Sequence, residues 1–166
     1  MTRTSSILLG ALALGLVTGM RSTLAPTLVS RALADRDDLE FADEPARTLG
    51  AHRTRQILMP LAAGELLGDK MPFAPDRTIA PSMLFRALSG GVTAAALAGA
   101  QRQPIWLPAI VGATAALGAS KIGLALRKPY QPHALTNAAL GLAEDSIALA
   151  IGTAGIREAL GNGRSA

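Results

Sequence analysis

The chain of 166 residues contains no cysteine, which excludes a disulfide scaffold and an enzyme that works through a thiolate. Charged residues are scarce: they make up 17% of the chain, against roughly 25% in ordinary soluble domains. Aromatic residues make up only 3%, and no basic stripe interleaved with aromatic side chains occurs, so nucleic acid is not expected as a partner. Two classes of protein remain: a membrane protein and an alanine-rich soluble helical bundle.

Apolar residues dominate what is present. They make up 49% of the chain, and with a formal net charge of +4 this composition excludes a disordered chain. The length suits one domain. We therefore expect residues 1–166 to form a single transmembrane helical domain, with a polar loop at about 35–55 and a flexible tail at about 161–166.

The apolar pattern predicts an all-α fold with about five transmembrane helices. The stretch from Ser5 to Met20 is uncharged and its pattern resumes after Arg21, which favours an uncleaved helix over a cleaved signal peptide. We expect this first helix to be kinked or broken near Arg21–Pro26. The fourth helix, of some 22 residues, would span roughly 33 Å, which matches a bilayer core. The five predicted helices cover about 5–33, 57–68, 82–101, 104–127 and 134–160.

Rows of small residues favour the membrane over the soluble bundle. In lipid, helices associate by close backbone approach through small side chains, whereas in water each glycine inside a helix costs about 1 kcal/mol relative to alanine. Such rows are also able to pack one subunit against another, so a homo-oligomer is a further expectation. Three rows repeat every four residues: Ala11, Gly15 and Gly19; Gly91, Ala95 and Gly99; and Ala115, Ala119 and Gly123.

Ionisable residues inside apolar segments are the candidate functional residues, because such groups are costly at membrane depth and face a partner, water or a substrate. One interpretation is a network of ion pairs that holds the helices together. The other is a polar intramembrane site for an ion, a proton or an anionic headgroup. The set comprises Arg21, Glu65, Asp69, Lys70, Arg86, Lys121, Glu144 and Asp145.

Metal binding and catalysis receive little support from these residues. Glu65 and Asp69 share a helix face and Glu144 and Asp145 are adjacent, but this spacing is a weak signal for a divalent cation. No recognised catalytic motif is present, and we expect no cofactor, no metal and no enzyme activity.

The distribution of arginine and lysine sets an expected orientation. Five crossings would put the 31–55 segment, the turn at Arg102 and the C-terminus on one side of the membrane, and Arg3 on the other. The first side carries more basic residues, which favours the cytoplasm for it.

Four short motifs resemble the DUF4126 family of small bacterial integral membrane proteins. They are Gly19-Met20-Arg21-Ser22 followed by Pro26, Glu65-Leu66-Leu67-Gly68-Asp69-Lys70-Met71-Pro72, Arg86-Ala87-Leu88-Ser89-Gly90, and Glu144-Asp145. The resemblance covers most of the chain outside the acidic 35–50 segment and the C-terminal tail. It implies a multi-pass helical protein of the bacterial inner membrane and supplies no reaction.

These observations lead to three functional expectations, with the lipid bilayer as the first partner. The first is a small carrier or channel-like protein with a charged mid-membrane site for an ion, a proton or an anionic group. The second is a structural or assembly protein whose buried charges form packing ion pairs. The third is a magnesium-dependent enzyme that acts on lipid phosphates.

Overall fold

The computed structural model describes residues 2–68, 80–127 and 134–161, and all regular structure in these residues is helical. This confirms the predicted all-α fold. The predicted residues Asp69 and Lys70 and most of the predicted flexible tail lie outside the described residues. The helices are α1 (Arg3–Met20), α2 (Leu24–Ala34), α3 (Ala46–Gly50), α4 (His52–Gly68), α5 (Ala80–Gly99), α6 (Trp106–Arg127) and α7 (Ala134–Gly161), with a 3₁₀ turn, η1 (Leu39–Phe41).

The first predicted helix is interrupted, as expected, between Met20 and Leu24. Arg21 has an extended backbone (φ −137°, ψ 110°), which ends α1. Pro26 lies in the first turn of α2, where the missing N–H of proline leaves no helical hydrogen bond unmade. Proline therefore helps to begin the second helix and does not kink a continuous one.

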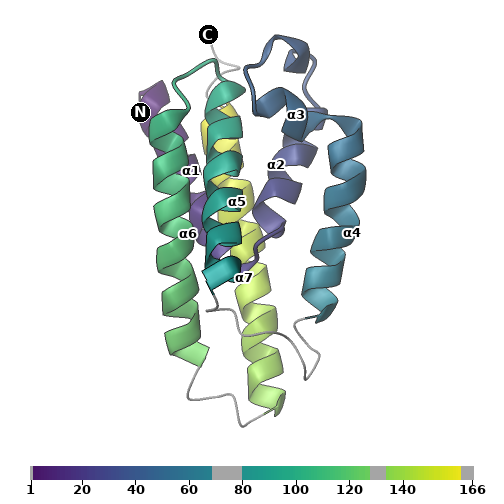
Figure 1. Cartoon of the computed structure of the whole chain (residues 1–166), viewed down its shortest axis with the longest axis vertical. Coiled ribbons are helices and arrows are strands. Elements are labelled where there is room, and N and C mark those ends of the chain that lie inside the picture. Colours follow the sequence, from purple (N-terminus) through teal and green to yellow (C-terminus); the bar gives the residue numbers. More distant parts are fainter. Residues whose placement is uncertain (1, 69–79, 128–133, 162–166) are drawn as a thin grey trace.

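The interruption reverses the chain, so that α1 and α2 form a hairpin and not a single kinked span (Figure 1). Near the start of α1, the Ser6 hydroxyl donates to Glu158 of α7 over 3.0 Å. At the same end of the bundle, Gln101 donates to the carbonyl of Ala159, and Asp43, which follows α2, donates from its backbone to Gly99. The start of α1 and the end of α2 therefore lie at one end of the molecule.

This hairpin changes one part of the expected arrangement, the position of Arg3. Arg3 lies at the same end as the 35–55 segment, the turn at Arg102 and the C-terminal end of α7, not at the opposite end (Figure 1). The sequence pattern missed this because the apolar residues of α1 and α2 read equally well as one long helix or as two antiparallel ones.

Small residues bring α1, α5 and α6 into close contact. A side chain on Gly15 or Gly19 would collide with α6, at Gly112 and Ala115 or at Ala116 and Ala119. The predicted rows thus pack inside this chain at these positions. Gly123 ends one row with open space around it.

The 35–55 segment is partly helical, and local ion pairs join several of its charged side chains. It contains η1, α3 and the first turn of α4, so it is less of a loop than predicted. Arg36 binds Asp38 through two hydrogen bonds, of 2.7 and 2.6 Å, and this contact holds the pKa of Asp38 below its ordinary value. Hydrogen bonds from Thr48 and Arg47 do the same to the pKa of Glu44.

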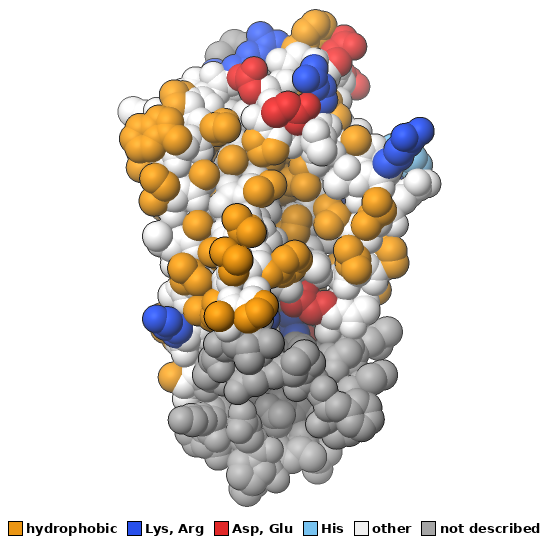
Figure 2. All heavy atoms as spheres, in the orientation of Figure 1, with side chains coloured by type: hydrophobic (Ala, Val, Ile, Leu, Met, Phe, Trp, Pro, Cys, Tyr) orange, Lys and Arg blue, Asp and Glu red, His pale blue; other side chains and the backbone are white. Residues whose placement is uncertain are grey.

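On the face seen in Figure 2, apolar side chains cover much of the bundle, and several charged side chains gather at the end that holds the 35–55 segment. Leu84, Phe85 and Leu88 of α5 are each more than half exposed. Ile57 of α4 and Ile122 of α6 are 62% exposed. Within the described residues, one helix, α1, is long and apolar enough to cross a membrane.

The packing predicts that Gly15→Ala destabilises the protein and Gly118→Ala does not. The new methyl group at position 15 would overlap Gly112 and Ala115, at a cost of about 1–3 kcal/mol. At position 118 nothing lies within 4 Å, and alanine is the better helix former by about 1 kcal/mol. Thermal unfolding of both variants in detergent, followed by circular dichroism, measures the difference. Equal melting temperatures would contradict this packing.

Candidate functional site at the bend between α1 and α2

The bend, residues Arg21–Thr23, lies inside the bundle and not at its end. The hydroxyl of Ser120 on α6 donates to the carbonyl of Gly19 over 3.2 Å, and Asp145 on α7 pairs with Arg21. From these contacts α6 extends about 10 Å further and α7 about 16 Å further, at 1.5 Å per residue. The chain therefore reverses at a level where two longer helices continue past it.

Glu65 of α4 caps the start of α2. Its Oε1 accepts from the backbone N–H and the hydroxyl of Ser22, both over 2.7 Å. Its Oε2 accepts from the N–H and the hydroxyl of Thr23, over 2.8 and 2.6 Å. Thr23 makes no capping bond within its own helix, so a carboxylate from another helix fills that role. A negative charge here also opposes the positive end of the α2 dipole.

Arg86 of α5 caps the end of α1. Its Nη1 donates to the carbonyls of Gly19 over 2.7 Å and Thr18 over 3.3 Å, and its side chain is 5% exposed. These carbonyls belong to the last turn of α1, which lacks helical donors and carries the negative end of the dipole. Ser89, one turn further along α5, donates to the carbonyl of Ser22 over 2.7 Å.

Arg21 and Asp145 form an ion pair at the site. Arg21 Nε lies 2.5 Å from Asp145 Oδ1, and the two side chains are 3% and 16% exposed. Arg86 also lies within electrostatic range of Arg21, Glu65 and Glu144. Five of the eight predicted residues therefore lie in one region: Arg21, Glu65, Arg86, Glu144 and Asp145.

Lys121 is the predicted residue that does not belong with this group. Its side chain is exposed on α6. Its neighbour Ser120 faces α1, and successive residues point about 100° apart around a helix, so Lys121 turns outward. Its exposed side chain does not share the buried setting of Arg21 and Arg86.

Hydroxyl groups are the part of the site that the sequence did not reveal. Ser22, Thr23, Ser89 and Ser120 all bond across helices at the bend. Serine and threonine are common throughout the chain, and only Ser22 and Thr23 carry a usable signal, since they directly follow the residue at which the helix was expected to break.

The site combines carboxylates and guanidinium groups in a buried setting. Such a set can exchange a proton at a carboxylate or hold a small ion against the opposite charge. Among the residues that the structure describes, no group of three His, Cys, Asp or Glu is placed to hold a metal ion.

Comparisons with known proteins add no relative. No family model, curated protein or solved structure matches the chain. The resemblance to the DUF4126 family therefore rests on the four sequence motifs alone.

The capping geometry predicts that Glu65→Ala destabilises the protein by about 2–4 kcal/mol, because donors at the start of α2 lose a charged acceptor. Glu65→Gln keeps one acceptor oxygen and should lose less. Glu40→Gln, at an exposed acidic residue of η1, is the control. Chemical or thermal unfolding in detergent measures all three, and an unchanged stability of Glu65→Ala would rule out the cap.

Proposed function

We propose that the protein is a multi-pass membrane protein whose α1–α2 hairpin enters the bilayer and reverses within it, and that the bend carries a site for a small ion, a proton or an anionic group that the protein moves across the membrane. The observation that carries this proposal is the burial of opposite charges at a helix interruption inside a bundle with an apolar surface.

The apolar sides of the bundle support the membrane location. Monomeric soluble proteins rarely expose large contiguous apolar patches, yet five α-helices here (α1, α4, α5, α6 and α7) expose leucine, isoleucine or phenylalanine. In the view of Figure 2, several charged side chains outside the bend gather at the end that holds the 35–55 segment, while Lys121 is exposed on α6. In this proposal α4, α5, α6 and α7 cross the membrane. α1 is long enough to cross the membrane by itself, but in this proposal the chain turns back at the end of α1, inside the bilayer.

Interrupted helices at membrane depth are tolerated where protein or a water-filled cavity forms hydrogen bonds with their free backbone groups. Transporters place their substrate and ion sites at such interruptions, so the bend supports carriage. Glu65 and Arg86 satisfy the two helix ends and hold the bend in place. The Arg21–Asp145 pair lies beside them and is the part of the site to which we assign the exchange of a proton or an ion. Asp145 is the more exposed of the two and is the residue on which we place the exchange.

The second candidate is a structural or assembly protein, and the capping contacts favour it. Glu65 and Arg86 bind backbone groups of the bend, as residues that only hold helices together would. Under this alternative the Arg21–Asp145 pair fixes α7 against the hairpin and moves nothing. No observation in the described residues favours the magnesium-dependent lipid-phosphate enzyme.

The hairpin predicts that both ends of the chain lie on the same side of the membrane as the 35–55 segment. Because the chain has no cysteine, single cysteines at Thr2, Glu40 and Arg157 give clean labelling sites. A membrane-impermeant maleimide should label all three from the same side, which the positive-inside rule makes cytoplasmic. Permeabilised cells provide the control for access. Labelling of Thr2→Cys from the opposite side would restore the five-crossing topology and refute the hairpin.

Carriage predicts flux in reconstituted vesicles. We expect the protein to raise proton flux, read by a pH-sensitive dye, or halide flux, read by a halide-sensitive dye, above that of protein-free vesicles. Asp145→Asn should lower that flux about tenfold or more, equivalent to at least about 1.4 kcal/mol. Glu40→Gln should leave it unchanged.

The same variants separate the two candidates. Breaking the pair at one side should cost about 3–5 kcal/mol of stability under either candidate. If the exchanged pair Arg21→Asp with Asp145→Arg regains stability and the wild-type protein shows no flux of either ion, the structural function holds and carriage is refuted. If stability returns and flux does not, the pair has a role in carriage beyond packing.

A further inference from the structure

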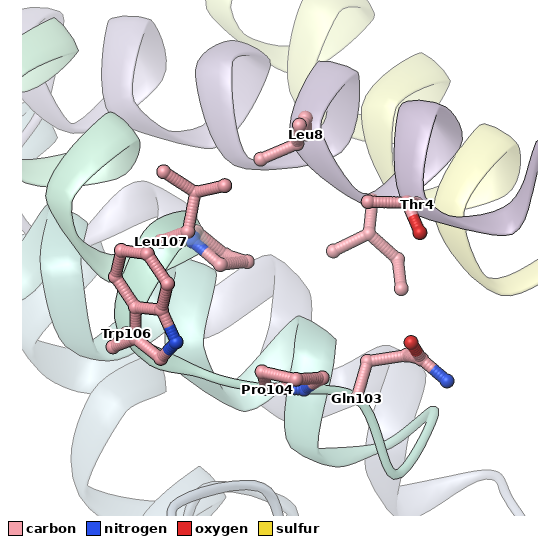
Figure 3. Close-up of a pocket in the computed structure, with 8 residues that line it drawn as sticks. Thr4, Leu8, Gln103, Pro104, Trp106 and Leu107 are labelled. Atoms are coloured by element: carbon pink, nitrogen blue, oxygen red, sulfur yellow. The ribbon is translucent and has the colours of Figure 1, made fainter.

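A cavity lies between the start of α1 and the start of α6, at the end of α1 opposite to the bend (Figure 3). Its volume is about 230 Å³, and its walls include Leu8, Trp106 and Leu107. Among the described residues no charged side chain lines it, and Thr2 already caps the start of α1. The part of this cavity that the structure describes therefore has no group that would select a ligand.

The start of α2 is different, because four hydrogen-bond donors there already hold a carboxylate. The backbone N–H and hydroxyl groups of Ser22 and Thr23 all donate to Glu65 over 2.6–2.8 Å. α2 has 11 residues, so the positive end of its dipole adds to the attraction for negative charge. The arrangement is that of an anion site whose ligand is a side chain of the same protein.

A buried cation lies next to this carboxylate. Arg86 is 5% exposed and lies within electrostatic range of Glu65. Its Nη1 caps the end of α1, whereas its buried Nε has no hydrogen-bond partner among the described residues. Ser89, which shares a helix face with Arg86, donates to the carbonyl of Ser22, so this face of α5 meets the start of α2. A positively charged N–H donor is thus left for a further acceptor beside Glu65.

Glu65 belongs to a helix at the edge of the bundle. α4 packs mainly against α2 and α3, and its Met59 and Leu61 are each 52% exposed (Figure 1). Pro60 lies inside α4, where proline removes one helical hydrogen bond and favours a bend. A Cβ at Gly64, next to Glu65, would have nothing within 4 Å. The part of α4 that carries Glu65 therefore has a point at which it can bend away from α2.

We propose that the start of α2 is a binding site for a small monovalent anion, such as a halide or formate, and that Glu65 occupies this site as a gate. When the end of α4 bends away, an anion from solution replaces the carboxylate on the donors of Ser22 and Thr23, beside the charge of Arg86. One negative charge replaces another, so the net charge of the site is kept. The inference rests on the proposed function, because it names the ion that the bend carries.

Removal of the carboxylate tests the site in detergent, without transport. Glu65→Ala leaves the four donors without their acceptor, so a free anion that fits should restore part of the lost stability. At about 0.1 M chloride or formate, we expect the melting temperature of this variant to exceed by roughly 2–4 °C its value in gluconate, a much larger anion of the same charge, at equal ionic strength. The wild-type protein and Glu40→Ala should show no such difference.

Two further variants locate the anion. Glu65→Ala combined with Thr23→Val lacks one hydroxyl donor and should need about tenfold more chloride or formate for the same rise, because the lost hydrogen bond is to a charged ligand. Thr153→Val is the matched control, since the hydroxyl of Thr153 is on the exposed face of α7 and bonds only to its own helix. Combined with Glu65→Ala, it should leave the response to both anions unchanged.

Halide flux in reconstituted vesicles tests the gate. Glu65→Gln keeps one acceptor oxygen but no negative charge, so it competes less well with an anion for the donors of α2. We expect its halide flux to exceed that of the wild-type protein about fivefold or more. Glu40→Gln should leave the flux at the wild-type value.

Equal melting temperatures of Glu65→Ala in chloride, formate and gluconate would overturn the inference, as would a rise that Thr23→Val leaves unchanged. If Glu65→Ala does not fold, the flux of Glu65→Gln decides, and a value no higher than wild type would overturn the gate. A rise in melting temperature without halide flux in any variant would support the anion site and refute carriage, so the two failures are distinguishable.

Discussion

The architecture depends on the capping of two helix ends in the interior of the bundle. The end of α1 and the start of α2 expose backbone groups that no helix can satisfy by itself, and a buried backbone group without a partner is costly. Glu65 supplies the acceptor and Arg86 the donor, one from α4 and one from α5. Each charge also opposes the dipole end that it meets. Two helices outside the hairpin thereby fix its position and its depth.

Close packing by small residues makes this capping geometrically feasible. Gly15 and Gly19 let α1 approach α6 with backbone in contact, and Gly90 does the same between α5 and α6. This approach brings Ser120 of α6 to the carbonyl of Gly19, beside the guanidinium of Arg86. A larger side chain in these rows would separate the helices and prevent the hydrogen bonds at the bend from forming. The polar contacts at the bend therefore depend on the glycine rows.

The charged residues of the site were largely accessible from the sequence, and their partners were not. Arg21, Glu65, Arg86 and Asp145 stand out because each interrupts an apolar segment. Which charges pair is a matter of helix direction: once α2 runs antiparallel to α1, Arg21 meets Asp145 and Glu65 meets backbone N–H groups. Lys121 shows the limit of the argument, since a charge within an apolar segment points inward or outward according to helix rotation, which the pattern left open.

The sequence by itself determined the helical class, the places where most helices begin and end, the interruption near Arg21 and the small-residue rows, because these follow from local preferences and periodicity. Only the tertiary structure decided that the interruption is a reversal, that both ends of the described chain lie together, and that Glu65 and Arg86 are caps. These features depend on contacts between residues tens of positions apart, for which a single sequence carries no local signal. The chain has few charged residues, and the fold places many of them at one end of the bundle and at the bend.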